Sequence, residues 1–272
     1  MEWFLEIISD YTFVQNAIIA GILSSIACGV TGTFVVVKKI SYIGGGIAHA
    51  VMGGLGIAYF LGINPLLGAL VFAVFAAFVI GLVKLKLKES EDTIISALWA
   101  IGMATGVIFA YLTPGYNVDL LSFLFGNILM VSSESLWILL ILDVVILLVV
   151  FIFYRQLVYV CFDEEYAALR GIKVDYVYIM LLVMVALTIV ILVQTVGLIL
   201  VIALLTLPSA IAKLFSKNIA KMMLISVLLI TSFFLIGFYF SLQANLPSGA
   251  SIILIAGAGY LVAFAINRIK YS

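Results

Sequence analysis

The chain has 272 residues, of which 66% are hydrophobic and only 10% are charged. Soluble domains carry roughly a quarter charged residues, so lipid must cover much of the surface of a chain this apolar. Its 13 basic and 13 acidic side chains cancel, and a net charge of zero argues against nucleic acid as a partner. The composition therefore predicts an all-α polytopic membrane protein, which we expect to form one transmembrane domain over residues 1–272.

Nine apolar runs follow one another along the chain. A helix needs roughly 20 apolar residues to cross the hydrocarbon core of a bilayer. The runs lie at about 14–37, 42–62, 65–83, 93–112, 134–154, 175–194, 196–214, 220–241 and 249–267. Apolar residues continue almost without a break through 194–197. Residues 119–131 are apolar but too few to span, so we expect a short outer half-helix there.

The N-terminal segment lacks the features of a cleavable signal peptide. Its first eleven residues carry Glu2, Glu6 and Asp10 but neither Lys nor Arg. A signal peptide begins with a basic region, so the charge here has the wrong sign. We therefore expect the first apolar run to be retained as a membrane span.

The basic residues predict an orientation, because cytoplasmic loops retain Lys and Arg. With nine alternating spans and the N-terminus outside, all 13 basic residues fall on the cytoplasmic side. They are Lys38, Lys39, Lys84, Lys86, Lys88, Arg155, Arg170, Lys173, Lys213, Lys217, Lys221, Arg268 and Lys270. The outer side receives Glu2, Glu6, Asp10, Asp119 and Glu134. The expected topology is therefore N-terminus outside and C-terminus cytoplasmic.

A short helix outside the membrane is predicted between the fifth and sixth runs, at about 163–171. Its residues suit their places: Asp163 as N-cap, Glu164 and Glu165 in the first turn, Arg170 in the last turn and Gly171 at the left-handed C′ position. Tyr166 and Leu169 share one face. Helices that lie on headgroups favour Lys and Arg on their polar face, whereas this one begins with three acids. The pattern favours docking to a cytoplasmic protein, and an ATPase that drives transport would need such a rigid contact.

His49, the single histidine, lies within the second apolar run. Ionisable residues at such depth are costly and usually face a helix bundle or a pathway. His49 either hydrogen-bonds a neighbouring helix or binds a metal ion, since neutral imidazole is a common ligand of transition metals. Its flanking glycines allow helix backbones to approach closely and favour a narrow passage; they are Gly44, Gly45, Gly46, Gly53, Gly54 and Gly56.

Three other residues carry weaker signals. Pro208 interrupts the seventh run, where it removes a helical hydrogen bond and crowds the carbonyl of Leu204, so it is a candidate kink and gate. Asp143 lies within the fifth run, and the sequence assigns it no role. The two cysteines, at 28 and 161, have no CxxC spacing, which argues against a disulfide framework or a zinc knuckle.

Several stretches together resemble the permease subunits of metal-transporting ABC importers, the zinc- and manganese-type ABC-3 permeases. They are Gly32–Gly44 with Ala48–Ala50, Asp119–Gly126, the helix that ends in Arg170 and Gly171, Val196–Pro208, and Leu246–Gly249. One such stretch would be weak evidence, but the ordered set covers the chain nearly end to end. The resemblance implies a multi-pass permease of the plasma or inner membrane.

The resemblance also implies partners and roles. It implies a homodimer of permeases, two cytoplasmic ABC ATPase subunits and an extracytoplasmic protein that delivers the metal. The helix at 163–171 would be the coupling helix, with Asp163, Glu165, Tyr166, Leu169, Arg170 and Gly171 at the contact with the ATPase. His49 matches the histidine that the family places in the metal path. No permanent cofactor is implied, only a transported divalent ion such as zinc or manganese.

The sequence departs from the family pattern at two positions. Many relatives carry an aspartate four residues before the histidine, where this chain has Gly45, and another after the outer Phe-Gly, where it has Asn127. Losing a carboxylate at 45 removes a partner for a hard ion such as manganese, which tilts the expected cargo slightly toward zinc and leaves its identity open.

Two other classes of function are alternatives to an ATP-driven permease. No GxxxxGK[ST] stretch occurs, so ATP would have to be hydrolysed by a separate subunit. An ion-coupled secondary transporter without an ATPase is the alternative, but it usually needs several intramembrane acids, and only Asp143 and His49 are available. An intramembrane enzyme lacks the paired acids, His-rich motif or Ser-His pair that it would need.

Overall fold

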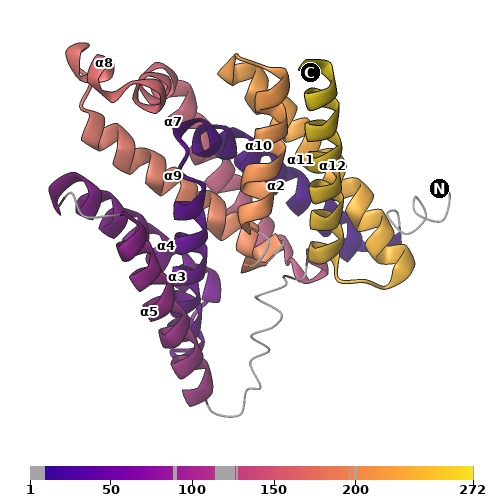
Figure 1. Ribbon diagram of the computed structural model, residues 1–272. Helices are drawn as coiled ribbons and strands as arrows, with labels where there is room; N and C mark the ends of the chain where they lie inside the picture. Colours follow the sequence, from indigo (N-terminus) through magenta and orange to yellow (C-terminus); the bar gives the residue numbers. More distant parts are fainter. Residues whose placement is uncertain are drawn as a thin grey trace. The chain divides into compact units, whose positions relative to one another are not determined.

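The computed structural model describes residues 10–87, 91–113, 126, 128–195, 197–198 and 201–271. All regular secondary structure in this part of the chain is helical (Figure 1). The long helices are α2 (Thr12–Lys38), α3 (Ser41–Phe60), α4 (Pro65–Leu82), α5 (Glu91–Leu112), α7 (Ser133–Phe162), α9 (Val174–Thr195), α10 (Val201–Phe215), α11 (Ile219–Ala244) and α12 (Ser248–Tyr271). Shorter elements are the π-helix η1 (Val83–Leu87), the 3₁₀ turn η2 (Ile128–Met130) and α8 (Glu164–Leu169). The predicted all-α class is confirmed.

Each of the nine predicted apolar runs coincides with one long helix. Eight of these helices are long and apolar enough to cross a membrane. The remaining long helix, α10, corresponds to the seventh predicted run and has 15 residues. It extends about 22 Å, less than the hydrocarbon core of about 30 Å. The boundary that the sequence left open lies after Thr195, where Gly197 adopts a left-handed φ of +84°. The orientation across the membrane stays a prediction.

The outer half-helix predicted at 119–131 falls mostly outside the described residues, which exclude 114–125 and 127. Within the described part, Ile128–Met130 form the single turn η2. Glu2, Glu6, Asn127 and Asp119 likewise lie outside the described part of the chain.

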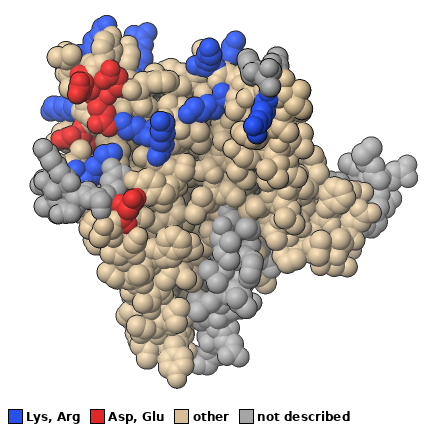
Figure 2. Space-filling view, viewed as in Figure 1, with Lys and Arg blue, Asp and Glu red and all other residues tan. Residues whose placement is uncertain are grey.

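The chain divides into two compact units, and the first comprises residues 1–36, 121–147 and 191–272. In this unit α10, α11 and α12 pack together, joined by short turns, so neighbouring helices run in opposite directions. Lys213 lies in the last turn of α10, Lys221 in the first turn of α11 and Arg268 near the end of α12, so these basic side chains share one end of the helices. Figure 2 shows Lys and Arg gathered along the upper edge of the molecule. This arrangement agrees with the charge segregation on which the predicted topology rests.

The second unit comprises residues 37–120 and 148–190, and its centre is α3. Glycines let the α3 backbone contact both neighbouring helices. A Cβ on Gly56 or Gly106 would meet the backbone of the facing helix, because Gly106 of α5 lies against Met52 and Gly56 of α3. Gly54 of α3 and Gly68 of α4 approach each other in the same way. Contacts between helix backbones in a membrane require small residues, which explains why glycines crowd this part of the sequence.

A leucine at Gly106 should destabilise the second unit. Its side chain would overlap the carbonyl of Met52, and overpacking of this kind costs about 1–3 kcal/mol. The expected result is a lower melting temperature of the detergent-solubilised protein, followed by size-exclusion chromatography after heating. Gly257→Leu is the matched control, because a Cβ at Gly257 of α12 would meet no atom within 4 Å. Equal melting temperatures for the two variants would contradict this packing.

Candidate functional site

His49 lies on α3 and faces α5. Its ring stacks on the indole of Trp99, with ring centroids 4.0 Å apart and planes within 5° of parallel. Its Nδ1 atom is buried and has no hydrogen-bond partner within the described part of the chain. Nδ1 therefore does not make the hydrogen bond to a neighbouring helix that the simple alternative for His49 requires. The ring stacks on Trp99, and its buried Nδ1 has no hydrogen-bond partner among the described residues.

The surroundings of His49 follow from the sequence of α3. From Gly44 to Ala58 this helix carries only glycine and aliphatic or thioether side chains besides His49. Gly46 leaves room for Ile95, and Gly102 of α5 lies against the backbone of Ala50. The close approach of α5 on both sides of His49 brings Trp99 within stacking distance. The imidazole is thus the one ionisable group on this stretch of the helix.

The described residues contain no group of three or more His, Cys, Asp or Glu side chains that could hold a metal ion together. Met52, a second candidate donor on α3, is buried against Gly106. Within this part of the chain, His49 is therefore a candidate donor that belongs to no such group.

Asp143 is buried in the first unit, with 2% of its surface exposed. It lies on α7 close enough to Ala27 and Cys28 of α2 to interact with both. The structure thus places Asp143, to which the sequence assigns no role, in the interior of its unit.

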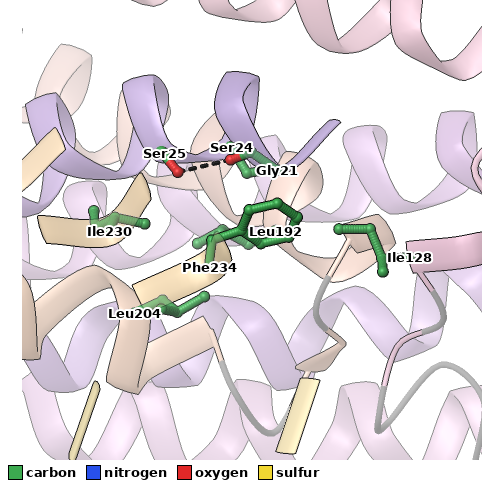
Figure 3. A pocket seen from close by; sticks show the side chains of 8 residues that line it. All are labelled: Gly21, Ser24, Ser25, Ile128, Leu192, Leu204, Ile230 and Phe234. Carbon is green, nitrogen blue, oxygen red and sulfur yellow. Dashed lines mark hydrogen bonds between the residues drawn. The ribbon is translucent and has the colours of Figure 1, made fainter. Parts of the chain in front are cut away.

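A small cavity in the first unit is lined mainly by hydrocarbon (Figure 3). Its walls come from α2, η2, α9, α10 and α11, and they include Ile128, Leu192, Leu204, Ile230 and Phe234. The Ser25 hydroxyl on its wall donates to the carbonyl of Gly21 at 2.7 Å. Divalent cations prefer several oxygen or nitrogen ligands, so this lining is unsuited to them.

The helix predicted at 163–171 is α8, and its caps are those that the sequence predicts. The Asp163 carboxylate accepts a hydrogen bond from the Tyr166 amide at 2.9 Å. Gly171 adopts φ +76°, its amide donates to Ala168, and the Ile172 amide donates to Ala167. These two bonds form a Schellman motif, which satisfies the last carbonyls of the helix. The six-residue helix α8 is therefore capped at both ends.

The two faces of α8 differ sharply. Leu169 is 88% exposed, Glu165 and Arg170 are also exposed, and Ala167 on the opposite face is buried. Tyr166, 40% exposed, packs edge-on against Tyr159 of α7, and the Arg170 guanidinium lies 5.1 Å from its ring centroid. Tyr166 is therefore held in place, while Leu169 projects freely. An exposed leucine beside ordered charged and aromatic side chains is typical of a docking surface.

Sequence reasoning missed two contacts. The first is the stacking of Trp99 on His49. The signal for it was an aromatic residue on a glycine-rich helix that could pack closely against the helix of His49. The second is an ion pair between Lys38 and Glu164 in the second unit, 2.5 Å between Nζ and Oε1. Glu164 precedes Ala167 by three residues and so shares its face, which could have indicated that Glu164 points inward.

Pro208 lies inside α10, and the helix continues past it to Phe215. Gly32 of α2 approaches α10 so closely here that a Cβ would overlap the Leu205 carbonyl and meet the Ser209 hydroxyl. Non-helical dihedral angles within a long helix occur instead at Phe153 of α7, with φ −105° and ψ 15°. The role of Pro208 as a gate stays a prediction.

A family model described as the ABC 3 transport family matches residues 10–267, almost the whole chain. The chain belongs to the ABC 3 transport family. The family and the apolar helices make it a multi-pass cell-membrane protein, which confirms the predicted resemblance and localisation. Membership of this family gives the chain a transport role.

Relatives cover nearly all of the chain. It is 43% identical to a membrane protein of Synechocystis described as uncharacterised, over 95% of this chain and 92% of the relative. It is 34% identical to the manganese transport system membrane protein MntC of Halalkalibacterium halodurans, over 97% of this chain and 90% of the relative. Among solved structures, PsaBC from Streptococcus pneumoniae in complex with Fab matches with a TM-score of 0.88 and 32% identity, covering 97% of this chain and 95% of that chain.

Removing either cap should loosen α8. Asp163→Ala loses the N-cap, worth about 1 kcal/mol, and Gly171→Ala places a Cβ at positive φ at a cost of roughly 1–2 kcal/mol. Hydrogen exchange followed by mass spectrometry should show faster exchange of the amides of residues 164–172 in both variants. Gly62→Ala, with φ +65° in the turn after α3, introduces the same backbone strain elsewhere and should leave these amides unchanged. Unaltered exchange in both cap variants would refute the capping.

Proposed function

We propose that this chain is the membrane-spanning permease subunit of an ATP-driven importer of divalent transition-metal ions, zinc or manganese, and that residues 1–272 work as one permease domain. The observation that carries this proposal is the near full-length similarity to relatives named manganese transport system membrane protein and manganese import system permease protein. The stacked histidine on α3 supports a metal ion as cargo, since imidazole is the ligand that this stretch of helix offers.

Two lines of support point to different metals. The names of several relatives favour manganese. The residues around His49 favour a borderline ion, because Gly45 supplies no carboxylate and manganese prefers oxygen ligands. The proposal therefore keeps both metals, which uptake measurements can separate.

His49 is proposed to bind the ion in transit. A neutral imidazole held by Trp99 offers one nitrogen, and carbonyls or waters in the glycine-rich passage complete the coordination only while the helices keep one arrangement. A second copy of the permease in a homodimer supplies a second imidazole. Movement of α3 relative to its neighbours then changes the ligand geometry and releases the ion. An extracytoplasmic metal-binding protein delivers the ion on the side of the N-terminus.

The partner on the cytoplasmic side is proposed to be an ABC ATPase. The chain carries no phosphate-binding loop of the GxxxxGK[ST] type, so hydrolysis belongs to that subunit. The surface of α8 proposed to dock on it is formed by Asp163, Glu165, Tyr166, Leu169, Arg170 and Gly171. Leu169, the most exposed of the α8 side chains whose exposure is known, is suited to fill an apolar pocket. Pro208 is proposed as a pivot in α10 during transport.

The second candidate is an ion-coupled secondary transporter that works without an ATPase. The buried Asp143 is the observation that favours it, because intramembrane acids serve as proton relays in such transporters. The family match and the capped, exposed α8 favour the ATP-driven reading.

Replacing His49 by alanine should abolish uptake while the complex still assembles. The change removes the proposed ligand and leaves the glycine contacts of α3 intact. Uptake of radioactive manganese or zinc into vesicles that contain the reconstituted complex should fall to the level of vesicles without permease. Met52→Leu keeps the volume of a buried side chain on the same helix and should retain uptake. Normal uptake by His49→Ala would remove His49 from the metal path.

Leu169→Ala and Tyr166→Ala should weaken association with the ATPase. Truncating an apolar anchor at the centre of an interface typically costs about 2 kcal/mol or more. The amount of ATPase that co-purifies with an affinity-tagged permease measures the effect. Leu254→Ala, at a 75% exposed position on α12, is the control for loss of an exposed leucine. An undiminished yield of ATPase with both α8 variants would refute docking through this face.

A further inference from the structure

The side chain of Lys38 connects α7 and α8 in the second unit. Its Nζ atom donates to the Val160 carbonyl in the last turn of α7 at 2.7 Å and to the Glu164 carboxylate in the first turn of α8 at 2.5 Å. The Lys38 side chain is 12% exposed and that of Glu164 is 42% exposed. Hydrogen bonds between charged groups are about twice as strong as neutral ones, and partial burial reduces their screening. This contact is therefore more than a loose surface pair.

Lys38 also stands directly before the helix that carries His49. Only Lys39 and Ile40 separate it from α3, and both are constrained: Lys39 has a φ of +63°, and Ile40 is buried. His49 follows Ser41 by eight residues, about 12 Å along the helix axis. A displacement of Lys38 would therefore reach the N-terminus of α3 through two residues that have little freedom to absorb it.

Glu164 lies on the inward side of α8. It shares a face with the buried Ala167, whereas Leu169 is about 140° away around the helix and is exposed. Because both ends of α8 are capped, a force on its outer face moves the helix as a unit instead of unwinding it. One face of α8 is thus available to a partner while the other holds Lys38.

We propose that Lys38 and Glu164 are positioning residues for transport: their ion pair transmits movement of α8 to the start of α3 and so to His49. The inference rests on the proposed function and deepens it by naming the connection between ATPase docking and the metal path. Neither residue touches the ion or the ATPase in this role. Their loss uncouples ATP hydrolysis from uptake without preventing assembly.

The test uses the complete importer, permease with its ATPase, reconstituted in vesicles, and measures metal taken up per ATP hydrolysed. Lys38→Met keeps the length of the side chain without its charge, and Glu164→Gln keeps its shape. Each should lower this ratio on the order of fivefold or more, the lower bound of typical coupling between sites, while the ATPase co-purifies in normal amount. The double variant Lys38→Glu with Glu164→Lys regains the opposite charges but not the hydrogen bond to the Val160 carbonyl, so its ratio should lie above that of Lys38→Glu alone and below that of wild type. Lys217→Met, at an exposed position in the turn after α10, is the charge-loss control and should behave as wild type.

Each other outcome overturns the proposal. An unchanged ratio in both single variants excludes coupling through the pair. Loss of co-purifying ATPase would instead assign Glu164 to docking, and a ratio in the charge-reversed double variant no higher than that of Lys38→Glu alone excludes the ion pair as the cause. If wild type itself takes up no metal with its ATPase, the proposed function fails, and that result is distinct because it precedes any variant.

Discussion

The close approach of α3 to its neighbouring helices is the constraint on which the rest of the candidate path depends. Glycine backbones of α3, α4 and α5 lie in contact, and no other side chain fits at positions such as Gly54, Gly56 and Gly106. Lipid offers no hydrophobic drive between helices, so this contact must be maintained by van der Waals packing. It fixes Trp99 against His49 and thereby sets the orientation of the imidazole.

The same close packing limits the number of side chains that can bind a metal ion near His49. Glycines provide room but no ligating side chains, so His49 is not embedded in a dense donor set within the described residues. In the proposed role, this site would bind the ion through one imidazole and through groups whose positions depend on helix spacing. Small movements of α3 would then change the affinity for the ion, whereas a rigid cage of acids would hold it through the cycle. The connection from α8 through Glu164 and Lys38 to α3 would supply such a movement.

The sequence predicted the elements better than their contacts. Apolar runs located every long helix, because a membrane span needs a continuous stretch of hydrocarbon, and the residues at 163 and 171 predicted both caps of α8. Those features are local. The stacking of Trp99 on His49 and the pairing of Lys38 with Glu164 join residues 50 and 126 positions apart, and no periodicity of one segment encodes them. Gly197 adopts a left-handed φ of +84° inside the apolar run predicted at 196–214, a local conformation that the apolar pattern of the run does not encode.

The most direct test of the account is the energy source of metal uptake. Vesicles that contain the purified chain, with and without its ATPase, are loaded with ATP or given a proton or sodium gradient, and the accumulation of manganese and of zinc is measured. The account predicts accumulation of at least one of these metals only when both the ATPase and ATP are present. Accumulation by the chain alone in response to an ion gradient would contradict it.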